Sequence, residues 1–222
     1  MNRKVLNPYS TIRAHDDDDD DDDTPPPAEK PVVEKEASKP DMTERMLKAR
    51  TVMISSAIDD KVAARVIGEL LLLESDDPTK PITLYLNSPG GSVTSGFAIY
   101  DTLRLVQPRI RILCVGLTAS IATIILLGAN KEDRLSLPNT RLLIHQPLIA
   151  GNVYGPASDL EITANEILKT RDRLNKLLAA ETAQDLTRIE ADTHRDYWMT
   201  AQEAVEYGLI ARIVTTRAEI GQ

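Results

Sequence analysis

The sequence has very little cysteine and few aromatic side chains: one Cys, one Trp and one Phe among 222 residues, with aromatics at 4% in all. A lone cysteine, Cys114, excludes an intrachain disulfide and a cysteine-rich metal site. It also fits a reducing compartment, and we expect a cytoplasmic protein. The core must be built from Leu, Ile, Val and Ala, which the 42% content of hydrophobic residues allows.

Long apolar runs are nearly absent as well. The N-terminal MNRKVLNPYST has no apolar core, which argues against a secretory signal, and the acidic run that follows argues against a transit peptide. The segment 112–129 carries no charge over 18 residues, the lower edge of a membrane span. It contains Gly116, Thr118 and Thr123, however, and divides into a strand pattern and a helix pattern. We expect a buried strand–helix pair and no membrane segment.

The negative charge is concentrated at one end of the chain. Residues 1–41 hold six basic and twelve acidic side chains, including eight consecutive aspartates at 16–23, and are rich in proline. Such a segment repels itself and buries little apolar surface, so we predict a disordered tail. It would be a solvated spacer or, alternatively, an acidic segment that attracts calcium or a partner. The rest is nearly neutral and has no basic patch for nucleic acid.

Residues 42–222 have the pattern of one globular domain in which strands and helices alternate. This alternation predicts an α/β fold around a largely parallel sheet. The expected strands are 52–54, 82–86, 110–115, 133–136, 141–145 and 209–214, and the expected helices are 60–74, 93–107, 119–129, 158–184 and a short one from 200 to 208.

The helix over 158–184 has a narrow apolar seam, formed by Leu160, Ala164, Ile167, Leu174 and Leu178. A single narrow seam on a long helix favours packing against another helix, from another subunit or from the same chain. Capping boxes are expected at its start, over 158–161, and at the start of the short helix, over 200–203.

Histidine is scarce, with three in the chain. His15 lies beside the aspartate run, and His194 lies in a polar stretch. His145 follows the apolar 142–144, where a buried strand emerges, a common place for reactive groups in α/β sheets. His145 is the leading candidate for acid–base chemistry, and a structural histidine is the alternative.

Two further segments have the composition of a reactive site. Ser120 lies between a buried strand and an apolar helix, where a turn can expose its hydroxyl; it could also serve only as a helix cap. The glycines of Asn87–Gly91 follow another strand, so their backbone N–H groups could approach a ligand closely, as in an oxyanion hole, or simply form a turn. The segment lacks the G-x-x-x-x-G-K-[ST] phosphate-binding pattern.

Together these segments resemble the ClpP family, the proteolytic subunits of Clp protease. The resemblance rests on SPGGSVTSG at 88–96, GLTASIA at 116–122, RLLIHQP at 141–147, and IEADT followed by AQEAVEYGLI at 189–210. These motifs occur in the family's order and spacing, within a resemblance that runs from about residue 43 to 215.

The resemblance implies a serine endopeptidase with a defined set of residues. Ser120 matches the nucleophile, His145 the general base and Asp192 the acid that orients it, while the backbone N–H groups of Gly91 and Ile121 match the oxyanion hole. This chemistry needs no metal and no organic cofactor.

The resemblance also implies an architecture and partners. The family fold is similar to that of crotonases, a spiral of β-β-α units with a projecting strand–helix handle, here about 148–184. The implied assembly is two stacked heptameric rings, of one subunit type or mixed with a paralogue. A Clp-type ATPase unfoldase would feed polypeptide substrates into it.

The chain departs from the family pattern at several positions. The acidic tail replaces the segment that usually contacts the unfoldase, and Ala191 replaces a usual arginine beside the catalytic aspartate. Ala122 and Leu117 replace a usual glycine and glutamine. These changes favour altered substrate pockets or pairing with a paralogue. The alternatives to a peptidase are a non-catalytic ring subunit and a crotonase-like enzyme acting on acyl-CoA, which would not need the three triad residues together.

Overall fold

A computed structural model describes residues 41–149, 151 and 154–221. Apart from Asp41, the predicted disordered tail lies outside these residues. The first half of the domain contains α1 (Met42–Lys48), β1 (Thr51–Ile54), α2 (Asp60–Asp76), β2 (Ile82–Ser88), α3 (Val93–Leu105), β3 (Ile110–Ala119) and α4 (Ile121–Leu126). The second half contains β4 (Arg134–Ser136), β5 (Arg141–Ile144), α5 (Ala157–Thr182), α6 (Leu186–Asp192), β6 (Tyr197–Thr200), α7 (Ala201–Tyr207) and β7 (Arg212–Ile213).

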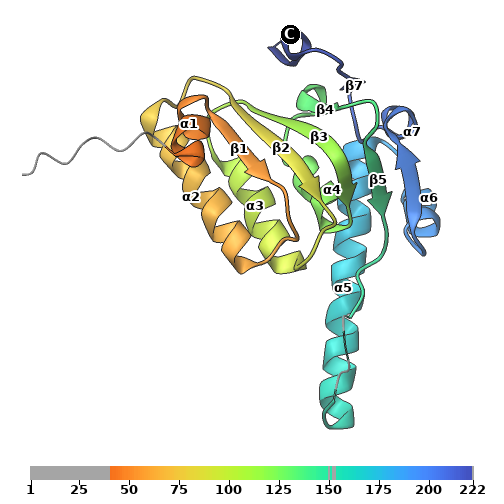
Figure 1. The fold of residues 1–222 in the computed structure, drawn as a ribbon. Coiled ribbons are helices and arrows are strands. Elements are labelled where there is room, and N and C mark those ends of the chain that lie inside the picture. The colour runs from red at the N-terminus through yellow and green to blue at the C-terminus, as the bar shows by residue number, and fades with distance from the viewer. Residues whose placement is uncertain (1–40, 150, 152–153, 222) are drawn as a thin grey trace, which may run out of the picture. The chain divides into compact units, whose positions relative to one another are not determined.

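The sheet is mostly parallel, as the alternation of elements predicts. Its main path runs β1-β2-β3-β4-β7, with every neighbour parallel. The strand β5 pairs in parallel with the end of β3, and β6 pairs antiparallel with β5. Figure 1 shows α2 and α3 side by side along one face of β1 and β2, and α5 extending far beyond the sheet. The expected α/β class and the projecting helix are confirmed.

Helix α2 illustrates how sequence patterns produce these elements. The Asp59 side chain accepts a hydrogen bond from the Val62 N–H, so the expected cap is present. The buried residues are spaced by three or four along one face of the helix: Ala63, Val66, Leu70 and Leu73. This face packs on the sheet, where alternate residues of β2 are buried.

The uncharged run 112–129 divides into β3 and α4, as expected, and both are buried elements of the core. Over the described residues, none of the helices combines the length and the apolar character that crossing a bilayer requires.

A β-bulge divides β3 into two halves with different neighbours. The pairing with β2 changes register between Leu86 and Ser88, and Gly116 in the bulge has a φ of 65°. Before the bulge, β3 pairs with β4; after it, β3 pairs with β5, with Leu117 opposite Arg141. The bulge thus directs the end of β3 toward the end of β5.

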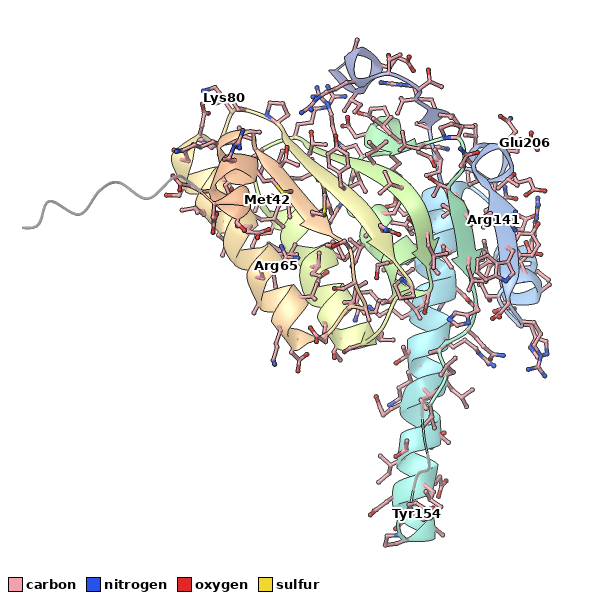
Figure 2. All side chains as sticks on the ribbon, in the orientation of Figure 1. Met42, Arg65, Lys80, Arg141, Tyr154 and Glu206 are labelled. Carbon is pink, nitrogen blue, oxygen red and sulfur yellow. The ribbon has the colours of Figure 1, made fainter. Side chains whose placement is uncertain are left out.

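The long helix α5 is buried only near its C-terminal end. Leu174 and Leu178 pack into the core, whereas the large side chains nearer its start are exposed: Leu160, Ile162 and Leu168. In Figure 2, Tyr154 lies at the far tip of this projection. The expected capping box at its start is wrong. The helix begins at Ala157 after an extended Pro156, so Ser158 is already inside the first turn.

Two helices and one strand were not predicted, and several boundaries differ from those expected: β3 runs on to Ala119, α4 covers only Ile121–Leu126, and the last strand is shorter. The helices α1 and α6 and the strand β6 are short and have no clear periodicity in the sequence. The capping box of α7, with Thr200 and Glu203, is confirmed. The last strand is shorter than expected, because the N–H groups of Leu209 and Ile210 bond to the Ala204 carbonyl and close the end of α7.

The contrast between two leucines of α2 gives a test of this packing. Leu70 is fully buried and Leu72 is 57% exposed. Leu70→Ala should lower the free energy of unfolding by about 2–5 kcal/mol, because it leaves a cavity in the core. Leu72→Ala should change it by less than about 0.5 kcal/mol. Urea-induced unfolding of both variants measures the difference, and equal losses would contradict the assigned face of α2.

Candidate active site

Ser120 lies at the sharp turn between β3 and α4. Its φ of 58° and ψ of −129° are uncommon for a residue with a side chain, a conformation that costs on the order of 1–3 kcal/mol. The turn is held by the Ser120 N–H, which donates to the Leu143 carbonyl of β5 over 2.9 Å. A second bond runs from the Thr123 hydroxyl to the Ser120 carbonyl over 2.6 Å. Rigid elements therefore hold a strained serine in place.

The Ser120 hydroxyl contacts His145 and does not cap its helix. Its Oγ lies 2.9 Å from His145 Nε2, and it makes no side-chain capping bond to α4. His145 directly follows β5, whose pairing with β3 sets Ala119 opposite Leu143. Since the two strands are parallel, their carboxyl ends lie at the same edge of the sheet. The structure thus brings together two of the residues that the sequence singles out.

The other imidazole nitrogen of His145 has a carboxylate partner. Nδ1 lies 3.1 Å from Asp196 Oδ1, in the loop between α6 and β6. The resemblance implies Asp192 in this place, so the structure departs from that expectation. The reason is the register of β6: Ile144 pairs with Tyr197, which sets Asp196 beside His145.

Asp192 makes its contacts elsewhere. It is the last residue of α6, and its Oδ2 accepts a hydrogen bond of 2.9 Å from the Tyr207 hydroxyl and lies 3.5 Å from Arg188 Nε. Burial, and after it the bond to Asp192, raise the pKa of Tyr207 above its ordinary value. The phenol therefore stays protonated at neutral pH and keeps donating to Asp192.

The paired glycines pack directly against the Ser120 turn. A Cβ on Gly90 would lie 2.6 Å from Ser120 Cβ, so only glycine fits this approach. Gly91 bridges to Ile58: the Ile58 N–H donates to the Gly90 carbonyl, and the Ser92 N–H donates to the Ile58 carbonyl. In such a parallel bridge the N–H of Gly91 itself points away from Ile58.

The second donor of the expected oxyanion hole is the backbone N–H of Ile121, which has no hydrogen-bond partner within the helix. Ile121 is the first residue of α4, where a backbone N–H has no partner within the helix. Its side chain packs against Gly96 of α3, where an added Cβ would come within 2.2 Å of Ile121 Cγ1.

A small, mostly apolar pocket adjoins the serine and histidine. Beside Ser120 and His145 it is lined mainly by Val93, Ile124, Ile144, Pro147, Leu174 and Leu178. These side chains come from α3, α4, β5, the loop after β5 and α5, so several parts of the chain meet next to Ser120 and His145.

The other candidate reactive groups are inert, line another pocket or lie outside the described residues. Cys114 is fully buried in β3, and burial raises the pKa of its thiol to about 12, so it holds little thiolate at neutral pH. His194 lines a separate polar pocket with Gln146 and Asn175, and His15 lies outside the described residues. Within the described part of the chain, no three His, Cys, Asp or Glu residues are grouped as metal ligands.

Fold and site together define an α/β protein with a mostly parallel sheet and a serine–histidine pair at the ends of two adjacent strands. Residues 34–217 match the Clp protease family. The chain belongs to this family, and its domain is a ClpP-like peptidase domain. The resemblance found in the sequence is thereby confirmed.

A pair of glycine variants tests the close packing around Ser120. Gly90→Ala should lower the free energy of unfolding by about 2–4 kcal/mol, since Gly90 has a φ of 95° and no room for a Cβ. Gly68→Ala is the matched control, because an added Cβ on this exposed face of α2 meets nothing within 4 Å. There the change should be neutral or stabilising, by up to about 1 kcal/mol. Urea-induced unfolding that gave the reverse order would refute this packing.

Proposed function

We propose that the chain is a serine-type endopeptidase subunit in which Ser120 is the nucleophile and His145 the general base. The observation that carries the proposal is the 2.9 Å contact between Ser120 Oγ and His145 Nε2. A nucleophile and base within hydrogen-bond reach, with the base held by a third group, is the arrangement that activates a serine hydroxyl. The strained turn that presents Ser120 supports the same role.

The reaction follows from this geometry. His145 Nε2 takes the hydroxyl proton as Ser120 Oγ attacks the carbonyl carbon of a peptide bond. The protonated imidazole then gives its proton to the leaving amine, which leaves an acyl group on Ser120. Water, activated by the same nitrogen, releases the acyl group and restores the serine.

The oxyanion formed during this attack needs hydrogen-bond donors. We assign this role to the backbone N–H groups of Gly91 and Ile121, which follow from the family resemblance. Two features support the assignment: the Ile58 bridge turns the Gly91 N–H away, and Ile121 is the first residue of its helix. Removing one such donor typically costs on the order of 10²–10³ in rate.

The third group is an aspartate at the end of α6 or in the loop that follows it. Family resemblance gives the orienting role to Asp192, whereas the carboxylate at His145 Nδ1 belongs to Asp196. Either residue would complete a triad of serine, histidine and aspartate.

We further propose that the substrates are unfolded polypeptides delivered by a Clp-type ATPase to stacked heptameric rings, of one subunit type or mixed with a paralogue. This part rests on family membership. The exposed apolar side chains of α5, Leu160, Ile162 and Leu168, support assembly through that helix.

The test of the nucleophile is reaction with a fluorophosphonate, followed by intact-mass analysis. The wild type should gain one adduct, which maps to Ser120, because His145 activates this hydroxyl. Ser120→Ala should gain none. Ser136→Ala is a matched control, since the Ser136 hydroxyl is buried in β4 and bonds to the Leu137 carbonyl; it should label like the wild type.

The outcomes of this experiment distinguish the possible functions. An adduct on a residue other than Ser120 would overturn the assignment. No adduct on the wild type, alone or mixed with a catalytic paralogue, would favour a non-catalytic ring subunit. Hydrolysis of an acyl-CoA that persists in Ser120→Ala would instead favour the crotonase-like alternative.

A further inference from the structure

We propose that residues 56–60, which lead from β1 into α2, position the backbone of the paired-glycine loop, residues 88–92. Ser88 and Asp60 are the positioning residues at the two ends of this contact. The inference rests on the proposed function, because the N–H of Gly91 is assigned there to the oxyanion hole. It starts from one observation: alternate residues of the 56–60 segment each bond to the loop or to the first turn of α3.

The middle of the 56–60 segment pairs with the glycines through the backbone. The Ile58 N–H donates to the Gly90 carbonyl, and the Ser92 N–H donates to the Ile58 carbonyl, both over 2.8 Å. The Ile58 side chain is 2% exposed and belongs to the hydrophobic core, which holds the segment in place. A Cβ on Gly91 would lie 2.2 Å from the Ile58 carbonyl oxygen, so the two backbones are in direct contact. The position of the Gly91 N–H therefore depends on where Ile58 lies.

Ser88 joins the two backbones at one end of this contact. It is fully buried at the end of β2. Its hydroxyl donates to the Ser56 carbonyl over 2.6 Å and accepts from the Gly90 N–H over 3.1 Å. A hydroxyl can donate one bond while it accepts another, so a single side chain satisfies both groups. Without this hydroxyl, the buried Gly90 N–H would lose its partner.

Asp60 makes a corresponding contact at the other end. The hydroxyl of Ser95, which is 4% exposed in the first turn of α3, donates to Asp60 Oδ1 over 2.6 Å. A hydrogen bond to a carboxylate is stronger than one between neutral groups. This bond attaches the first residue of α2 to α3, the helix that begins directly after the loop, at Val93.

These contacts prepare the loop for its role beside Ser120. The N–H groups on either side of Gly91 are occupied, that of Gly90 by Ser88 and that of Ser92 by Ile58. The Gly91 N–H points away from Ile58, while Gly90 packs on the Ser120 turn. A donor to a developing oxyanion is effective when it is held in place before the reaction. Ser88 and Asp60 do not touch the reacting atoms and act through this backbone.

The test measures the rate of fluorophosphonate labelling at Ser120 over a range of reagent concentrations, because the phosphoryl oxygen of the reagent takes the place of the oxyanion. Ser88→Ala should lower the maximal labelling rate on the order of 10–10²-fold, since a small misplacement of a positioned group has effects of this size. The reagent concentration at half-maximal rate should not change, because Ser88 does not line the pocket beside Ser120.

Ser136→Ala is the matched control, because it removes another fully buried serine hydroxyl that bonds to a carbonyl. Both variants should unfold at a lower urea concentration than the wild type, since each loses a buried hydrogen bond. Only Ser88→Ala should label slowly. Equal slowing in the two variants would show that lost stability, and not the loop, controls the rate, and would overturn the inference.

Two variants of Asp60, whose side chain is exposed, give a second test that leaves the core intact. Asp60→Ala removes the acceptor of the Ser95 bond and should lower the maximal labelling rate about tenfold. Asp60→Asn keeps Oδ1 as an acceptor and should label within about threefold of the wild type.

If Ser88→Ala labels at the wild-type rate, the 56–60 segment does not position the loop, and Ser120 remains the nucleophile. If the two Asp60 variants label equally fast, the bond to Ser95 has no such role. A wild type that labels nowhere would contradict the proposed function itself.

Discussion

The parallel pairing between the end of β3 and β5 is the contact on which the site depends. Three register pairs, from Leu117 opposite Arg141 to Ala119 opposite Leu143, fix the two strand ends side by side. The Ser120 N–H then continues this ladder by donating to the Leu143 carbonyl. The serine is therefore attached to the strand that carries His145, and the 2.9 Å contact between their side chains follows from the backbone arrangement.

Buried Arg134 holds the C-terminal end of α4 in place. It is 1% exposed, and its guanidinium donates to the carbonyls of Leu127 and Ala129 beyond α4 and pairs with Glu181 of α5. A buried charge is tolerated only when such partners satisfy it. By joining the end of α4, the start of β4 and the C-terminal turn of α5, this residue fixes the helix that begins beside Ser120.

Much of the fold and the proximity of Ser120 and His145 could be predicted from the sequence. Strong periodicity predicts α2 and α3, and the change from an apolar strand to an apolar helix predicts the turn at Ser120. The contacts of Asp192 and Asp196 could not be predicted in this way, because both lie in the same polar stretch. The choice between them depends on the register of β6, a short strand whose pattern of one exposed, one buried and two half-buried residues carries little signal. The bulge at Gly116 could not be predicted from the local sequence either, because it is defined by the pairing of β3 with β2.

Because the Asp196 side chain is exposed, solvent affects its interaction with His145. Its side chain is 63% exposed, whereas that of His145 is only 16% exposed, so the pair lies at a boundary between water and protein. Water and dissolved ions weaken an interaction at such a boundary. A surface that covered this loop would exclude water and lower the local dielectric, and the same 3.1 Å contact would then orient the ring more strongly. Enclosure of this loop would thus strengthen the contact without any movement of the two residues.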